Sequence, residues 1–279
     1  MRVIEADIIV QAVSELCINS NLYLDKDLLE SLKAARDKES SKLGKSALET
    51  IVKNAETAAA EALPICQDTG MAVVFAEIGS QVYVNGDISA AINEGVRQGY
   101  NKGYLRNSVV KDPIKRINTG DNTPAVIYYD IVQGDKLKLS LAPKGFGSEN
   151  MGGVKMLNPS DGIEGIEQFV ISTVKAAGAN PCPPIIVGVG TGGTMDKAAL
   201  LSKQALLKNV NDSNPDDFWA ETERRLLAKI NRLYIGPSGY GGDTTALAVH
   251  ILTYPTHIAG LPVAVNINCH AARHKAVIL

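Results

Sequence analysis

The sequence predicts a mixed α/β (α+β) fold in which a helical N-terminal layer packs on mixed β-sheet lobes. Three observations predict it: strong helix formers fill most of the first sixty residues, the apolar period changes near Gly70, and helix-like and strand-like segments then alternate. No internal repeat, low-complexity segment or Pro/Ser linker divides the chain. We therefore expect residues 1–279 to form one continuous mixed domain, with two lobes as an option.

Three helices are expected at the N-terminus, because apolar residues recur there at helical spacing. Asp25 stands where the second helix would begin and suits an N-cap. The expected helices span residues 4–19, 25–40 and 46–63.

From Gly70 onward the pattern becomes mixed. Strand-like residues 71–79 and 81–86 precede a helix over residues 87–103 that Asp87 would cap. Further along, two strand-like segments flank Gln133-Gly134-Asp135, which predicts a β-hairpin of residues 124–132 and 136–142. After a glycine-rich loop at 144–157, helices are expected over 162–178, 195–210 and 218–233, an apolar strand over 183–190, and glycine-loop and strand segments over 236–252 and 261–268.

The composition describes a chain that can bury a substantial core. Of its 279 residues, 45% are hydrophobic and 21% charged, which excludes intrinsic disorder. The 28 basic and 30 acidic residues give a net charge of -2 without long runs, so neither nucleic acid nor a membrane is expected as a partner. Acidic residues interrupt the N-terminal apolar stretch, and no segment matches a membrane span of roughly 20 apolar residues. We expect a cytoplasmic protein.

Four cysteines lie far apart in the chain, which favours reduced thiols over a disulfide framework. Cys17 sits in a helical apolar pattern and is expected in the core. Cys66, Cys182 and Cys269 stand among helix and strand breakers at the edges of predicted elements, where side chains can converge on one site. Three single thiols fit a cubane iron–sulfur cluster with one iron that has no protein ligand. Such an iron can act as a Lewis acid.

A dinucleotide-binding turn is the first alternative. Residues Gly188–Gly193 satisfy G-x-G-x-x-G between a predicted strand and helix. The expected acidic end of a following strand is missing, because residues 195–210 favour a helix and Asp212 falls in a polar loop. Nicotinamide and flavin are therefore disfavoured, while anion binding by the loop and plain turn formation both stay open.

Zinc is the second alternative, because Cys269, His270 and His274 fall within one or two helical turns. Only His270-x₃-His274 has the spacing of paired zinc ligands, and Cys66 and Cys182 have no paired neighbour. A structural zinc site is therefore disfavoured.

The segment Cys66-Gln67-Asp68-Thr69-Gly70 places a carboxamide and a carboxylate beside a candidate ligand. Asp68 could exchange protons with a substrate held there. Taken alone, Asp68 is more typical of a turn or cap residue, and Arg106 is more typical of a surface arginine.

Six segments between residues 64 and 274 carry a resemblance to a known family, and the match runs over nearly the whole chain. They resemble, in order and spacing, the α subunit of the two-subunit class I fumarases, which are iron–sulfur hydro-lyases. The segments are PICQDTG (64–70), YLRNSVVKDP (104–113), KGFGSENMGG (144–153), NPCPPIIVGVGTGGTMDKAALLSKQAL (180–206), GPSGYGGDTTAL (236–247) and YPTHIAGLPVAVNINCHAARH (254–274).

The resemblance implies a cofactor and its ligands. In that family the cysteines matching Cys66, Cys182 and Cys269 hold a [4Fe–4S] cluster, and substrate oxygens bind its fourth iron.

It also implies roles for the site residues. Gln67 and Asp68 would contact substrate, with Asp68 as acid/base, and Arg106 would neutralise a substrate carboxylate through its planar fork. Gly147 would approach the substrate through its backbone. His257, twelve residues before Cys269, matches the family's substrate-contacting histidine and is the second catalytic candidate.

The resemblance finally implies a reaction and a partner. The reaction would be the reversible hydration of fumarate to (S)-malate, a step of the tricarboxylic acid cycle. Single-chain relatives continue into a second domain with further substrate-binding residues, so a separate β subunit is expected in an αβ or α2β2 hetero-oligomer. The L-tartrate dehydratase α subunit resembles the chain around its first two cysteines, but the segments after Cys182 and around Cys269 favour fumarase. A zinc-stabilised binding module and a non-catalytic iron–sulfur sensor remain alternatives from other classes.

Overall fold

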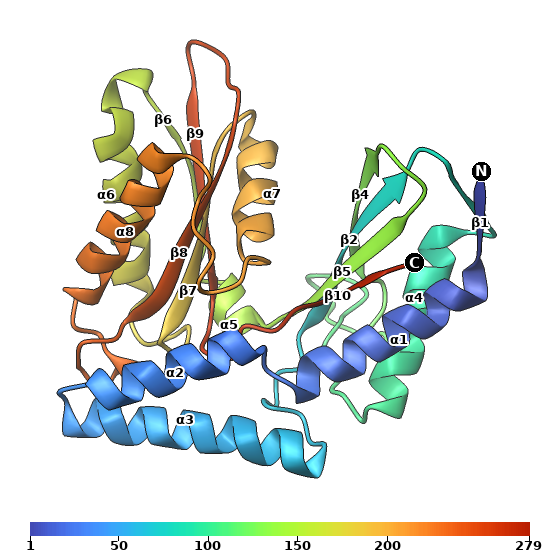
Figure 1. Ribbon diagram of the computed structural model, residues 1–279, viewed down its shortest axis with the longest axis horizontal. Helices are drawn as coiled ribbons and strands as arrows, with labels where there is room; N and C mark the ends of the chain where they lie inside the picture. Colours follow the sequence, from blue (N-terminus) through green and yellow to red (C-terminus); the bar gives the residue numbers. More distant parts are fainter. The chain divides into compact units, whose positions relative to one another are not determined.

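The computed structural model describes residues 1–279 and divides them into two compact units (Figure 1). Unit 1 comprises Met1–Leu24, Thr57–Phe146 and Arg273–Leu279, and unit 2 comprises Asp25–Glu56 and Gly147–Ala272. Each unit contains helices and a mixed sheet, so the predicted mixed α/β class is confirmed. None of the helices has the length and apolar character that crossing a membrane requires.

Unit 1 is a four-stranded sheet with two long helices packed into its core. The strand order is β10-β5-β2-β4, and a separate parallel pair joins β1 to β3. Apolar residues of α1 and α4 share one buried cluster with β2 and β5. The elements are β1 (Arg2–Glu5), α1 (Ala6–Leu22), β2 (Met71–Gly79), β3 (Val82–Asn85), α4 (Ile88–Lys102), β4 (Val126–Val132), β5 (Leu137–Lys144) and β10 (Lys275–Ile278).

One expectation for unit 1 holds and one needs a small change. The Asp87 carboxylate accepts a hydrogen bond of 3.0 Å from the Ala90 amide, so it caps α4 as predicted. The helix expected over residues 4–19 begins only at Ala6. Residues 2–5 form β1 instead, where Val3 and Ile4 suit a strand because their side chains are β-branched.

The predicted hairpin of residues 124–132 and 136–142 is wrong. Both segments are strands, but β2 lies between them, parallel to β4 and antiparallel to β5. The connection crosses the end of β2, where Ser80 N donates to Val132 O and Gly79 N to Lys136 O. A Cβ at Gly79 would lie 2.5 Å from Gly134 O, so this crossing requires glycine. The almost fully buried β2 takes the central position, which local turn signals cannot reveal.

Unit 2 is a second mixed sheet with helices on both faces. The strand order is β6-β9-β7-β8, with β7 parallel to β8 and antiparallel to β9. Helices α6 and α8 cover one face and α7 covers the other (Figure 1). The elements are α2 (Lys26–Lys38), α3 (Lys42–Glu61, whose last turn belongs to unit 1), α5 (Phe146–Glu149), β6 (Gly153–Leu157), α6 (Gly162–Ala177), β7 (Ile185–Gly192), α7 (Met195–Ala205), α8 (Asp217–Asn231), β8 (Ala246–Tyr254) and β9 (Leu261–Asn268).

The predicted helices and strands of unit 2 are present, with one addition and one shorter helix, since α7 ends at Ala205 and not at residue 210. The glycine-rich segment after Lys144 was expected to be a loop, but it holds the short helix α5 and the edge strand β6. At the opposite edge, β8 is protected by side chains. Glu223 accepts a hydrogen bond of 2.7 Å from Ile251 N, and the Asn214 amide donates one of 2.8 Å to Ile251 O. These bonds satisfy main-chain groups of the edge strand, to which a strand of another chain could otherwise hydrogen-bond.

Candidate active site

The loop Cys66–Gly70 in unit 1 is held by buried side chains from three other segments. Its last three carbonyl groups each accept at least one side-chain hydrogen bond. The donors are the Arg273 guanidinium to Asp68 O (2.7 Å), the Tyr100 hydroxyl to Thr69 O (2.7 Å) and Gly70 O (2.9 Å), and the Asn122 amide to Gly70 O (3.1 Å). Burial raises the pKa of Tyr100, so its hydroxyl stays protonated and able to donate. The loop is therefore fixed before any ligand arrives.

The Asp68 carboxylate is oriented by main-chain amides. Its Oδ1 accepts a hydrogen bond of 3.0 Å from Gly70 N, and its Oδ2 accepts one of 3.0 Å from Phe146 N. A Cβ at Gly145 would lie only 3.1 Å from Oδ2, so the backbone approaches the carboxylate closely there. Two fixed donors leave the half-buried carboxylate with its remaining lone pairs aimed in defined directions.

Arg106 and Gln67 belong to the same part of unit 1. Thr69 Oγ1 accepts a hydrogen bond of 2.9 Å from Arg106 N and donates one of 3.2 Å to Arg106 O, so the two loops are joined beside Asp68. The Arg106 and Gln67 side chains are exposed, and the Cys66 thiol lies 3.4 Å from Gln67 Oε1. The structure thus brings together four predicted site residues: Cys66, Gln67, Asp68 and Arg106.

Arg273 is one of the site components that the sequence analysis missed. Its side chain is 5% exposed, and its second terminal nitrogen donates a hydrogen bond of 2.9 Å to Asn21 Oδ1. The backbone of Asn21 in turn accepts a hydrogen bond of 2.9 Å from Ile65 N, next to Cys66. The sequence gives little signal for this role, because Arg273 stands between Ala272 and His274-Lys275, as a surface arginine could.

Cys182 and Cys269 meet at one end of the sheet in unit 2. Cys182 precedes β7 and Cys269 follows β9. The two strands are paired there, because Ile186 of β7 and Asn268 of β9 are register partners. The carbonyl of Cys182 accepts hydrogen bonds from His270 N (3.3 Å) and His270 Nδ1 (3.0 Å). These bonds tie the two cysteine-bearing loops together.

Two further features lie at that end of unit 2. Cys182 has a φ of +55°, a conformation that costs a non-glycine residue about 1–2 kcal/mol and is concentrated at functional sites. Gly147 lies nearby, because a Cβ built on it would be 3.8 Å from Asn180 O. The structure therefore groups Gly147 with Cys182 and Cys269.

The four thiols fall into two kinds, as predicted. Cys17 is fully buried in unit 1, and burial raises the pKa of its thiol, which makes it unreactive. Cys66 and Cys269 are half-buried, Cys182 is exposed, and none of the four is in a disulfide. The donor set fits an iron–sulfur cluster, because three reduced thiols lie on loops outside the core.

Ligation by all three thiols remains a prediction. Cys66 belongs to unit 1 and Cys182 and Cys269 belong to unit 2. No group of three His, Cys, Asp or Glu side chains that could hold a metal ion is present. The zinc alternative gains no support either, since Cys269 and His270 lie in unit 2 and His274 in unit 1.

His257 lies away from the other predicted residues of its own unit. It is in the loop between β8 and β9, whereas Cys269 follows the far end of β9. The eight residues of β9 separate these ends by roughly 23 Å at the usual strand rise, and Figure 1 shows the loop and the cysteine end of the sheet on opposite sides. The structure does not bring His257 together with Cys182 and Cys269 of the same chain.

The G-x-G-x-x-G segment serves helix packing. A Cβ at Gly188 would lie 2.2 Å from Ser202 O, and one at Gly190 would lie 2.1 Å from Ala198 O, so both glycines let α7 approach β7. The Gly193 amide donates a hydrogen bond of 3.1 Å to Pro255 O. This turn lies at the His257 end of the sheet, and the dinucleotide interpretation finds no support in it.

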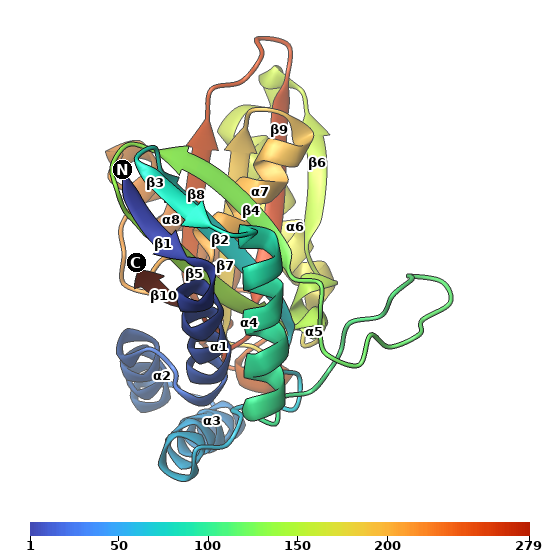
Figure 2. The ribbon, with the colours of Figure 1, turned by 90° about the vertical axis from the view of Figure 1, so that its right-hand side faces the viewer.

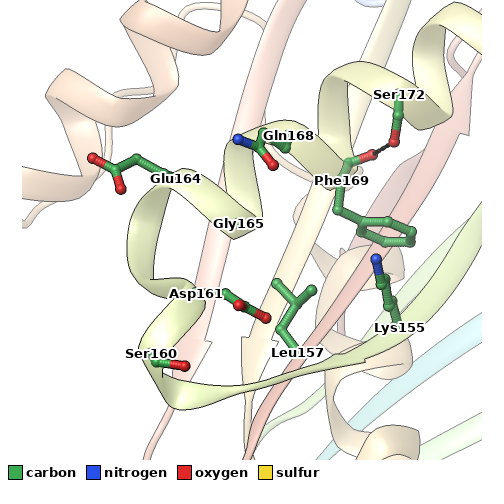
Figure 3. Close-up of a pocket in the computed structure, with 9 residues that line it drawn as sticks. All are labelled: Lys155, Leu157, Ser160, Asp161, Glu164, Gly165, Gln168, Phe169 and Ser172. Atoms are coloured by element: carbon green, nitrogen blue, oxygen red, sulfur yellow. Dashed lines mark hydrogen bonds between the residues drawn. The ribbon is translucent and has the colours of Figure 1, made fainter.

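A groove of about 580 Å³ between β6 and α6 lies outside the candidate site. Figure 3 shows Lys155 and Leu157 on β6, Asp161 just before α6, and Glu164, Gln168 and Phe169 on α6. None of the predicted site residues lines it.

Loop-borne thiols and a carboxylate oriented by main-chain amides are groups that an iron–sulfur hydro-lyase could use. A family model described as Fumarate hydratase (Fumerase) matches residues 10–278. The chain therefore belongs to this family of iron–sulfur hydro-lyases.

The similar proteins that have names are named as tartrate dehydratase subunits. The chain is 43% identical over 272 residues to the putative L(+)-tartrate dehydratase subunit alpha of Methanocaldococcus jannaschii, covering 95% of each chain. It is 33% identical over 257 residues to the L(+)-tartrate dehydratase subunit alpha of Escherichia coli K12, covering 91% of this chain and 84% of the relative. The comparisons therefore agree on a hydro-lyase, and they do not confirm the preference for fumarate over tartrate.

Proposed function

We propose that this chain is the α subunit of a two-subunit [4Fe–4S] hydro-lyase that hydrates fumarate reversibly to (S)-malate. The observation that carries the proposal is the Cys66–Gly70 loop, in which a thiol, a carboxamide and an amide-oriented carboxylate are consecutive and Arg106 is joined to them through Thr69. This combination suits a four-carbon dicarboxylate, which offers two anionic groups and a carbon acid between them.

The proposed cluster ligands are Cys66, Cys182 and Cys269. When bound through three thiolates, such a cluster supplies a Lewis acid at the iron that has no protein ligand. The pairing of Cys182 with Cys269 supports this set, because their loops are joined by hydrogen bonds at one end of the sheet in unit 2.

The protein residues have separate tasks in this proposal. Asp68 holds or moves the proton at the carbon next to a substrate carboxylate, which requires the fixed orientation that its two amide donors provide. Arg106 binds a substrate carboxylate with two parallel hydrogen bonds, which its planar guanidinium allows. Gln67 donates its carboxamide to a substrate oxygen, and the backbone at Gly147 lets the substrate approach closely.

His257 is proposed as a second catalytic residue, with a condition set by the geometry of unit 2. Because it lies at the opposite end of the sheet from Cys182 and Cys269, it cannot serve a substrate held at those cysteines in its own chain. Its role therefore requires a second copy of the chain.

The proposed partner is a β subunit, since both relatives bear the name subunit alpha. We propose that the β subunit supplies further substrate-binding residues and that the two kinds of subunit form an αβ or α2β2 assembly.

L(+)-tartrate is the second candidate substrate, because the relatives are named for its dehydration. Malate and tartrate share two carboxylates and a 2-hydroxyl group, and tartrate adds a 3-hydroxyl. The test is anaerobic assay of the reconstituted complex with fumarate, (S)-malate and L(+)-tartrate at equal concentrations. A kcat/KM at least tenfold higher for the fumarate–malate pair supports the proposal, and the reverse order assigns the enzyme to tartrate.

A further inference from the structure

The sheet of unit 2 has one closed edge and one open edge. The closed edge is β8, where the Glu223 and Asn214 side chains bond to the main chain of Ile251. The open edge is β6, which pairs only with β9, and Figure 2 shows it beside β9 at the margin of the unit. No hydrogen bond from outside the sheet reaches the main chain of residues 153–157. Edge strands are usually protected, so an open edge indicates a place for a further strand.

The register of β6 with β9 shows which main-chain groups are free. Met156 is the partner of Pro262, which has no N–H, and Pro262 O accepts a hydrogen bond of 3.0 Å from Thr191 Oγ1 on β7. Pro262 therefore turns its carbonyl toward β7, and Met156 is in a non-hydrogen-bonded pair with it. Because such pairs alternate along an antiparallel ladder, the N–H and C=O groups of both Val154 and Met156 point away from β9. They are available to another strand.

Apolar side chains accompany this edge on both faces of the sheet. On one face, Val154 is 45% exposed and Met156 is 54% exposed. On the other face, the groove of about 580 Å³ follows β6 beside α6 (Figure 3). A Cβ at Gly153 would lie 3.4 Å from Phe169 Cζ, and Leu157 lines the groove at the other end of the strand. Unpaired main-chain groups flanked by apolar side chains are the features by which a sheet edge binds an added strand.

The charge at the centre of β6 disfavours a second copy of β6 as the added strand. Lys155 is the middle residue of the strand. Antiparallel pairing of two copies about a twofold axis would therefore place two Lys155 side chains opposite each other, which is destabilising. Lysine on an edge strand is one of the devices that prevent self-association. The edge is complementary instead to a different strand that carries an acidic residue at this position.

We propose that a strand of the β subunit adds to β6 and extends the sheet of unit 2. The inference rests on the proposed function for the existence of that subunit, which the names of the relatives support. The added strand carries an acidic residue opposite Lys155 and apolar residues opposite Gly153 and Leu157, because these three residues of β6 share the face that borders the groove. Beyond Leu157, Asp161 and Glu164 at the end of the groove favour a basic residue.

Hydrogen exchange resolved to single amides tests the proposal directly. In the chain alone, the amides of Val154 and Met156 should exchange at nearly the rate of an unstructured peptide, and in the complex with the β subunit they should exchange at least tenfold more slowly. The Lys155 amide faces β9 and is the internal control, which should be protected in both states. Exchange of Val154 and Met156 that the β subunit does not slow, or equal protection in the chain alone, would overturn the proposal.

Proline substitution supplies an independent test. Met156→Pro removes an outward N–H and leaves the ladder to β9 intact, because proline is tolerated where the N–H of an edge strand faces solvent. Binding of the β subunit in sedimentation velocity should weaken at least tenfold, while the far-ultraviolet circular dichroism stays that of a folded chain. Met156→Ala is the matched control, which removes most of the side chain but keeps the N–H, and it should weaken binding less. Wild-type affinity in the folded proline variant contradicts the interface.

The interface and the proposed function fail in different experiments. If the complex forms with Val154 and Met156 protected but turns over none of fumarate, malate and L(+)-tartrate, the proposed function fails and the interface stands. If an active complex leaves both amides unprotected, the interface fails and the proposed function stands.

Discussion

The Arg273 guanidinium donates a hydrogen bond of 2.7 Å to the main-chain carbonyl of Asp68, although the two residues are 205 positions apart. The same side chain reaches Asn21 Oδ1 and is almost completely buried. A buried cation that bonds a carbonyl and an amide, beside a carboxylate and a set of candidate ligands, favours anionic groups in its neighbourhood. We therefore regard Arg273 as a positioning residue for the Cys66–Gly70 loop.

Replacing Arg273 should destabilise the protein and disturb that loop. Arg273→Met keeps much of the side-chain volume but leaves Asp68 O and Asn21 Oδ1 without their donors. The expected loss is about 2–4 kcal/mol of unfolding free energy, measured by urea denaturation. Arg224→Met, at an exposed ion pair with Glu221, is the control and should change stability by less than about 1 kcal/mol. Equal effects of the two substitutions would refute the role of Arg273.

Asp68→Asn should separate chemistry from folding. Asparagine is nearly isosteric and its Oδ1 can still accept from one main-chain amide, but it cannot take up a proton. We expect kcat to fall about 10²–10⁴-fold while the visible absorbance of the reconstituted cluster stays unchanged. Turnover within a factor of two of wild type would show that Asp68 is not the acid/base.

The cysteine assignment can be tested with a matched pair of substitutions. Cys182→Ser should abolish the visible absorbance after anaerobic reconstitution with iron and sulfide, while the far-ultraviolet circular dichroism stays that of a folded chain. Cys17→Ser should retain the cluster, because Cys17 is enclosed in the core of unit 1. A normal cluster spectrum in the Cys182 variant contradicts the proposed ligand set.

Acid should destabilise unit 2 through His250 on β8. Burial, aided by the nearby Lys208 cation, lowers the pKa of His250 from 6.5 to about 4, against the opposing effect of Asp212 and Asp27. Between these values the unfolded chain binds more protons than the folded one, so stability is lost as pH falls through the window and is retained above about 6.5. The full loss is about 3 kcal/mol.

The measurement is the urea midpoint at pH 7 and pH 5, for wild type and for His250→Gln. The wild-type midpoint should fall by the equivalent of about 2 kcal/mol more than that of the variant. Parallel pH dependence in the two proteins would mean that other groups cause the acid sensitivity.

Sequence patterns predicted the parts of the fold that depend on local chemistry. The Asp87 cap, the helix that ends before Gly178 and the buried strand β7 follow from side chains within a few positions of one another. The hairpin failed because strand character does not specify a partner, and β2 competes successfully for the central position. Strand β6 was missed because the glycines at its start are equally typical of a loop.

The residues of the candidate site also divide into those that a local sequence pattern predicts and those that depend on distant contacts. The thiols, Asp68 and Arg106 were predicted because their segments carry recognisable patterns, and Cys17 was correctly placed in the core. Arg273 and Tyr100 were missed, since each acts through a main-chain carbonyl far away in the sequence, which leaves no periodic or motif signal. The separation of His257 from the cysteines depends on the length and direction of β9, which its motif does not express.

The central claim is tested most directly by anaerobic reconstitution of the chain with iron and sulfide, followed by the visible spectrum, iron content and activity with and without the β subunit. The account predicts a brown protein with about four irons per chain that interconverts fumarate and (S)-malate only when the β subunit is present. A chain that stays colourless, or one that binds the cluster and turns over none of fumarate, malate and L(+)-tartrate with its partner, would contradict it.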